Sequence, residues 1–216
     1  RAPSRLQTNP APWGFRRRPV ACVIRHPLDR TVSEYYFQWY KKHPAAPPEF
    51  IQEKIPSFPD MKFGEYIEYQ ERFRQPAMLE SAGVDKTLDI GCQTIDFVRQ
   101  LFREPAQVLV KLSDSFIRSG KFKEYMPKSI HFLQTRTLNQ DLAEFLQSVG
   151  YSEKEVDFVR EHDKVQPGPG TERTSEDDWY SHYTEALLDR ILHEERYLFQ
   201  MLSRLGFSYG LKPSTA

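Results

Sequence analysis

The sequence predicts an α/β fold in which a small parallel sheet is flanked by helices. Two short apolar runs, 20–24 and 129–133, have the composition of buried strands. Each run precedes a segment whose apolar residues recur at helical spacing, and parallel strands require such crossover connections. The chain of 216 residues suits one domain with its own core. We expect this domain to span 20–210, between an N-terminal loop or remnant at 1–19 and a tail at 211–216.

The first strand and helix follow from a change of period. The β-branched run 20–24 ends before Pro27, which suits the first position of a helix. The apolar side chains that follow recur at i, i+4, i+7, i+8 and i+11 on one helical face, namely Leu28, Val32, Tyr35, Tyr36 and Trp39. A tight strand-to-helix turn of this kind is where α/β proteins bind phosphates.

The later elements are predicted in the same way. The proline-rich stretch 43–59 indicates a surface loop, and helices are expected over 61–73 and 89–102. Residues 108–126 fit neither period well and are assigned to helix. A helix is expected at 138–149, and capping boxes are predicted at Thr137 with Gln140 and at Ser152 with Glu155. A Gly/Pro-rich loop at 165–174 then leads to one long helix over 184–205.

Composition narrows the class of partner. Thirty basic and thirty acidic side chains cancel, so no overall field attracts nucleic acid, and we expect no nucleic-acid partner. No apolar run reaches the roughly 18 residues of a membrane helix, so no membrane span is expected within the chain. Cys22 and Cys92 lack the spacing of a zinc site, and no metal is expected.

The segment from Arg25 to Ser33 has the chemistry of a phosphate site. Arg25 stands at the carboxyl end of the first strand, where a guanidinium can bind phosphate oxygens in bidentate fashion. Backbone N–H groups at the start of the helix point the same way. Ser33 lies two helical turns beyond His26, so its hydroxyl returns to the same face. One phosphate could contact all three groups. The alternative is that Arg25 and Arg30 pair with acidic side chains and that Ser33 has no ligand.

The pattern from Arg25 to Phe37, R-x-P-x-x-R-x-x-S-x-Y-Y-F, resembles the 3′-phosphate motif of sulfotransferases that use 3′-phosphoadenosine 5′-phosphosulfate (PAPS). The carbohydrate enzymes, heparan and uronyl 2-O sulfotransferases, and related bacterial or algal members are the most similar. The resemblance implies a P-loop-type sheet, with Arg25 and Ser33 on the donor 3′-phosphate and Arg30 and Tyr35 in structural roles. Weaker similarity covers 93–94, 132–142 and 183–207.

The sequence also departs from that family. It lacks the P-K-x-G-S/T-S/T loop that holds the 5′-phosphosulfate, and 119–121 follows the motif instead of preceding it. No histidine or acidic residue occurs in 1–24, where the family's base would lie, so the catalytic residues are unknown. Because the chain begins with Arg1, we expect an N-terminally incomplete protein without its first βα unit, a fragment that itself could lack activity. The expected location is the Golgi lumen if a eukaryotic anchor was lost, and otherwise the cytoplasm.

Other candidate residues carry weaker signals. In the loop 164–173, Arg173 or Gln166 is a candidate donor contact, and a plain linker is the alternative. His26 could position the ligand, whereas core or surface roles are expected for the other histidines: His43, His131, His162, His182 and His193. The acidic runs 176–178 and 194–195 are expected on solvated helix faces.

The resemblance implies transfer of a sulfuryl group from PAPS, the only co-substrate expected, to an acceptor hydroxyl of a carbohydrate. One alternative is another nucleotide-phosphate transferase, such as a kinase relative. The second alternative is a non-catalytic α/β binding module in which the Arg25 and Ser33 pair is vestigial.

Overall fold

A computed structural model describes residues 19–162 and 176–210. Within these residues a two-stranded parallel sheet joins β1 (Val20–Ile24) to β2 (Ile130–Gln134). Val20 pairs with Ile130, and Ile24 pairs with Gln134. The predicted parallel sheet is confirmed; β1 has the predicted bounds, while β2 begins and ends one residue later than predicted.

Helices make up most of the described structure. They are α1 (Pro27–Phe37), α2 (Trp39–Lys42), α3 (Pro48–Gln52), α4 (Phe63–Tyr69), a π-helical turn (Gln70–Arg74), α5 (Gln75–Ser81), α6 (Cys92–Leu101), α7 (Pro105–Lys111), α8 (Asp114–Arg118), a 3-10 helix (Lys121–Tyr125), α9 (Leu138–Ser148), α10 (Glu153–Glu161), a second 3-10 helix (Glu176–His182), α11 (Glu185–Glu194) and α12 (Arg196–Arg204). The protein is therefore helix-rich and broadly α/β. None of the helices described is long and apolar enough to cross a membrane.

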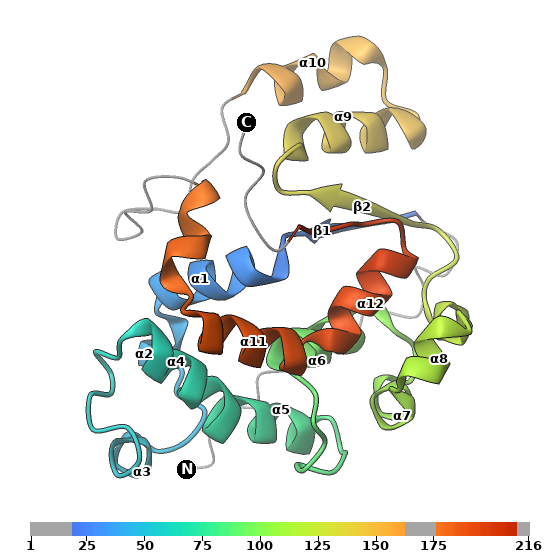
Figure 1. The fold of residues 1–216 in the computed structure, drawn as a ribbon. Coiled ribbons are helices and arrows are strands. Elements are labelled where there is room, and N and C mark those ends of the chain that lie inside the picture. The colour runs from blue at the N-terminus through green and yellow to red at the C-terminus, as the bar shows by residue number, and fades with distance from the viewer. Residues whose placement is uncertain (1–18, 163–175, 211–216) are drawn as a thin grey trace, which may run out of the picture.

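The helices form two layers around the strands. Figure 1 shows α9 and α10 on one side of the sheet and α1, α6 and α12 on the other. One buried cluster joins β1 to α6 and α12 through Ile24, Ile95 and Leu198. A second, aromatic-rich cluster packs α1 against α4 and the second 3-10 helix, for example through Leu28, Tyr66 and Trp179. Helix α1 thus runs from the sheet into the aromatic cluster, and its first turn is held between them.

Three local predictions are wrong. The stretch 43–59 is not all loop, because α3 starts at Pro48, whose fixed φ suits the first helical turn. The predicted helix over 184–205 is two helices that meet at Glu195. The box predicted at Thr137 does not form, since the Gln140 side chain bonds Glu144 instead of turning back to the cap.

Other predictions are confirmed. The Ser152 box forms, with the Ser152 N–H donating to Glu155 at 2.8 Å. The ambiguous stretch 108–126 is helical, as α7, α8 and the first 3-10 helix. The predicted loop at 165–174 lies outside the described residues.

Candidate anion-binding site

Arg25 and Ser33 come together at the carboxyl end of β1. Arg25 directly follows the last residue of the strand, and Ser33 lies in the second turn of α1. The Arg25 guanidinium donates from Nη1 to the Ser33 Oγ at 2.9 Å. Both side chains are partly exposed, so a ligand can reach them. Since Ser33 Oγ accepts this bond, its own hydroxyl proton is left to donate to an anion.

Asp29 completes this group. Its carboxylate forms an ion pair with the Nε of Arg25, across one helical turn, and the Asp29 side chain is only 8% exposed. An arginine offers five N–H donors in a fixed plane. Nε binds Asp29 and Nη1 binds Ser33, so the guanidinium has further N–H groups that can donate to another acceptor. Asp29 also offsets the charge of Arg25. Pairing of Arg25 with an acidic side chain is the alternative that the sequence left open, and the i, i+4 spacing favours Asp29 as the partner.

His26 caps the first turn of α1 and is held on both ring nitrogens. Nδ1 accepts from the Leu28 N–H at 3.2 Å, and Nε2 lies 2.9 Å from the Gly210 carbonyl oxygen. A ring that accepts at Nδ1 and donates at Nε2 is neutral. Burial lowers the pKa of His26, and Arg136 lowers it further, against the Gly210 hydrogen bond and Asp29, which raise it. His26 is therefore a structural cap, and its ring nitrogens are already engaged.

The His26 cap leaves fewer backbone N–H groups at the start of α1 for an anion than the sequence predicted. Pro27 has no N–H, the Leu28 N–H bonds His26, and the Arg30 N–H bonds the His26 carbonyl at 2.9 Å. The expectation that several amides at the helix start face the ligand is therefore not met. Side chains dominate this site.

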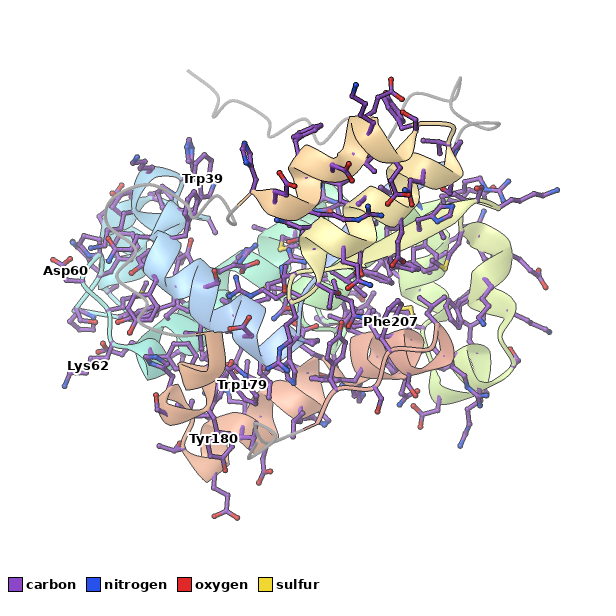
Figure 2. The ribbon with its side chains drawn as sticks, turned by 90° about the horizontal axis from the view of Figure 1, so that it is seen from above. Trp39, Asp60, Lys62, Trp179, Tyr180 and Phe207 are labelled. Atoms are coloured by element: carbon purple, nitrogen blue, oxygen red, sulfur yellow. The ribbon has the colours of Figure 1, made fainter. Side chains whose placement is uncertain are left out.

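Buried contacts fix the first turn of α1 in place. The Gln93 amide, 2% exposed, donates to the Pro27 carbonyl at 2.9 Å and to Thr31 Oγ1 at 2.6 Å. The Tyr183 hydroxyl donates to the Leu28 carbonyl at 2.9 Å. Trp179 stacks on His26 with ring centroids 4.7 Å apart, and Figure 2 shows it beside the start of α1. Elements distant in sequence therefore determine where Arg25 and Ser33 lie.

Arg30 points away from the Arg25 site into an ion-pair network. It bonds Glu34 at 3.0 Å and Asp96 at 3.4 Å, while Arg74 bonds the same two carboxylates at 2.6 and 3.3 Å. Burial raises the pKa of Glu34, but Arg74 and Arg30 outweigh it and hold that pKa below its ordinary value. Burial raises the pKa of Asp96 despite the two arginines. The structural role expected for Arg30 agrees with these contacts.

Tyr35 and Glu195 both form hydrogen bonds to distant parts of the backbone. Tyr35 donates to the Met61 carbonyl at 3.0 Å, which agrees with a structural role. Glu195 is 3% exposed, so its expected place on a solvated face is wrong. Its carboxylate accepts from the backbone N–H groups of Gln93 and Thr94 at the start of α6, both at 2.8 Å. No signal within 194–195 could have identified a contact formed across about a hundred residues.

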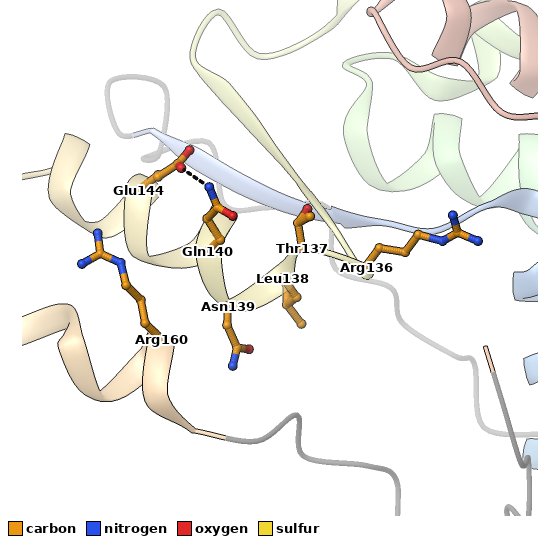
Figure 3. A pocket seen from close by; sticks show the side chains of 7 residues that line it. All are labelled: Arg136, Thr137, Leu138, Asn139, Gln140, Glu144 and Arg160. Atoms are coloured by element: carbon orange, nitrogen blue, oxygen red, sulfur yellow. Dashed lines mark hydrogen bonds between the residues drawn. The ribbon is translucent and has the colours of Figure 1, made fainter. Parts of the chain in front are cut away.

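A shallow pocket of about 540 Å³ opens beside the start of α9. It is lined by Arg136, Thr137, Leu138, Asn139, Gln140, Glu144 and Arg160. Figure 3 shows the Arg136 side chain pointing away from Glu144 and Arg160. Arg136 was not among the residues predicted for the site. Arg173 and the side chains of 176–178 lie outside the part of the structure described. The described residues contain no group of His, Cys, Asp or Glu side chains arranged to hold a metal.

Comparison with known proteins finds no matching family model, no matching curated protein and no matching solved structure.

Proposed function

We propose that the chain binds the 3′-phosphate of PAPS through Arg25 and Ser33, as the donor-binding part of a sulfotransferase with a P-loop-type fold. One observation carries the proposal: the guanidinium of Arg25 and the hydroxyl of Ser33 are 2.9 Å apart at the carboxyl end of a parallel strand. Ligands of α/β proteins bind at this edge of the sheet. A phosphate placed there accepts from the Arg25 Nη groups and the Ser33 hydroxyl together.

In the proposed reaction the sulfuryl group moves from PAPS to an acceptor hydroxyl, for which a carbohydrate is our candidate. The S–O bond to the donor phosphate breaks as the acceptor oxygen bonds sulfur, and the acceptor proton passes to a base. By analogy with phosphoryl transfer, positioning and charge stabilisation supply most of the rate. Arg25 and Ser33 contribute by anchoring the nucleotide, and we assign no catalytic residue.

Calorimetric titration with adenosine 3′,5′-bisphosphate tests the proposal. We expect micromolar binding by the wild-type chain and a loss of about ten- to hundred-fold in each of Arg25→Ala and Ser33→Ala, because each removes a charge-assisted hydrogen bond. Matched controls are Arg72→Ala, whose partner is Glu68, and Ser81→Ala, whose hydroxyl bonds the Met78 carbonyl. Both controls should bind as the wild type does.

Arg25→Ala also leaves the buried Asp29 carboxylate without this ion pair, so instability could imitate a loss of binding. The double variant Arg25→Ala/Asp29→Ala removes both charges and separates the two effects. If wild-type chain ignores the bisphosphate at millimolar concentration, or prefers ATP to it, the proposal is wrong. Preference for ATP would favour a kinase relative instead.

A further inference from the structure

The carboxyl end of β2 lies next to that of β1. Ile24 pairs with Gln134, and the ladder continues as the Thr135 N–H donates to the Ile24 carbonyl at 3.0 Å. Arg25 follows Ile24 on one strand and Arg136 follows Thr135 on the other. Two arginines therefore leave neighbouring parallel strands at the same edge of the sheet.

A carboxylate offsets the arginine charge at the end of β1. The positive charge of Arg25 is offset by Asp29 at direct contact, and His26 is neutral. A phosphomonoester carries close to two negative charges at neutral pH. Because Asp29 offsets the charge of Arg25, a further cation at this edge would strengthen the binding of a dianion.

Arg136 is placed to supply that charge. Its side chain is exposed and turns away from Glu144 and Arg160 (Figure 3), that is, away from the space between α9 and α10. Its positive charge acts on His26, whose pKa it lowers beyond the larger effect of burial. His26 directly follows Arg25, so the field of Arg136 reaches the start of α1.

We propose that Arg136 is the second cation of the site formed by Arg25 and Ser33, and that it contacts the same 3′-phosphate. The inference rests on the proposed function and adds a ligand residue from β2 to it.

Titration of the full chain with adenosine 3′,5′-bisphosphate tests this assignment. We expect Arg136→Ala and Arg136→Gln each to weaken binding about ten-fold, because a charge-assisted contact is lost. Arg136→Lys should recover part of that loss. The matched control is Arg160→Ala, since Arg160 lines the same pocket and pairs with Glu153. Thermal unfolding of every variant checks that the fold is retained, as expected for an exposed residue.

Two further measurements make the test specific. If Arg25 and Arg136 hold one phosphate, the double variant Arg25→Ala/Arg136→Ala should lose less than the product of the single losses. Adenosine 5′-monophosphate, which lacks the 3′-phosphate, should bind wild type and Arg136→Ala equally. An equal loss toward both nucleotides, or fully multiplicative losses, would overturn the assignment.

The outcomes distinguish this inference from the proposed function. If wild type binds the bisphosphate, Arg25→Ala does not, and Arg136→Ala binds as wild type does, only the role of Arg136 is overturned. If wild type does not bind the bisphosphate, both are overturned.

Discussion

A methyl group at Gly91 should destabilise the protein through one defined clash. Gly91 caps α6 with φ −66° and ψ 158°, a conformation that alanine adopts readily. A Cβ there would lie 2.3 Å from both Cδ and Oε1 of Glu195, and 2.7 Å from Oε2. Those atoms are buried and fixed by the Gln93 and Thr94 N–H groups and by Thr94 Oγ1, which donates at 2.7 Å. Gly91→Ala must therefore displace the carboxylate.

The magnitude follows from what the displacement breaks. Losing one hydrogen bond to a charged group costs about 1.5–3 kcal/mol, and overpacking adds about 1–3 kcal/mol. We expect Gly91→Ala to lower the free energy of unfolding by about 3 kcal/mol. Because α6 carries Gln93, which braces Pro27 and Thr31, the same variant should weaken ligand binding at Arg25.

Urea denaturation followed by circular dichroism measures this change. Gly64→Ala is the matched control, because its Cβ would meet only Leu187 Cδ1 at 3.7 Å, an ordinary contact in α4. In a Glu195→Ala background the added cost of Gly91→Ala should fall below about 0.5 kcal/mol, since the clashing atoms are gone. Equal stability of Gly91→Ala and Gly64→Ala would refute the reasoning.

Three further predictions concern groups around α1. Burial lowers the pKa of His26 in the folded protein. Below about pH 6.5 His26 is therefore protonated more readily in the unfolded chain than in the folded protein, and the free energy of unfolding should fall as the pH drops from there. His26→Asn, which can still cap Leu28, should reduce that slope in urea denaturation at pH 7.5 and 5.5, and an unchanged slope would contradict the assignment. Arg74→Ala should lower the free energy of unfolding by about 2 kcal/mol in the same assay, because Glu34 and Asp96 lose a shared partner. The exposed control Arg72→Ala should lower it by less than about 0.5 kcal/mol. Equal losses would contradict a structural role for the network. Trp179→Leu should weaken bisphosphate binding, because it removes the ring stacked on His26. The control Trp39→Leu should have a smaller effect, since Trp39 is 47% exposed on α2. The reverse order would show that Trp179 does not position Arg25 through His26.

Local sequence patterns predicted β1 and α1 well. The run 20–24 is short, β-branched and bounded by Pro27, and every one of these features acts within a few residues. The start of α1 and the approach of Ser33 to Arg25 follow from the same short-range geometry, because a helix returns to one face after two turns. Pairing of Arg25 with an acidic side chain was expected as an alternative to ligand binding, and the i, i+4 spacing alone would have identified Asp29 as the partner.

Long-range contacts explain the features that the sequence did not predict. The helix over 184–205 looks continuous from its period, yet it breaks where Glu195 bonds the start of α6. The hydrogen bond at Nε2 of His26 depends on Gly210, which is 184 residues away. The place of Arg136 at the same edge of the sheet as Arg25 depends on strand register, which neither segment encodes by itself. The candidate anion site therefore combines a predictable turn with partners that only the folded chain brings to it.

The crystal structure of this chain with bound adenosine 3′,5′-bisphosphate tests the central claim most directly. The account predicts 3′-phosphate oxygens at about 2.7–3.2 Å from the Nη atoms of Arg25 and from Ser33 Oγ. It also predicts that Asp29 remains on Nε of Arg25, as it is without the ligand. A nucleotide bound elsewhere, with Arg25 and Ser33 bonded only to each other, would contradict the account.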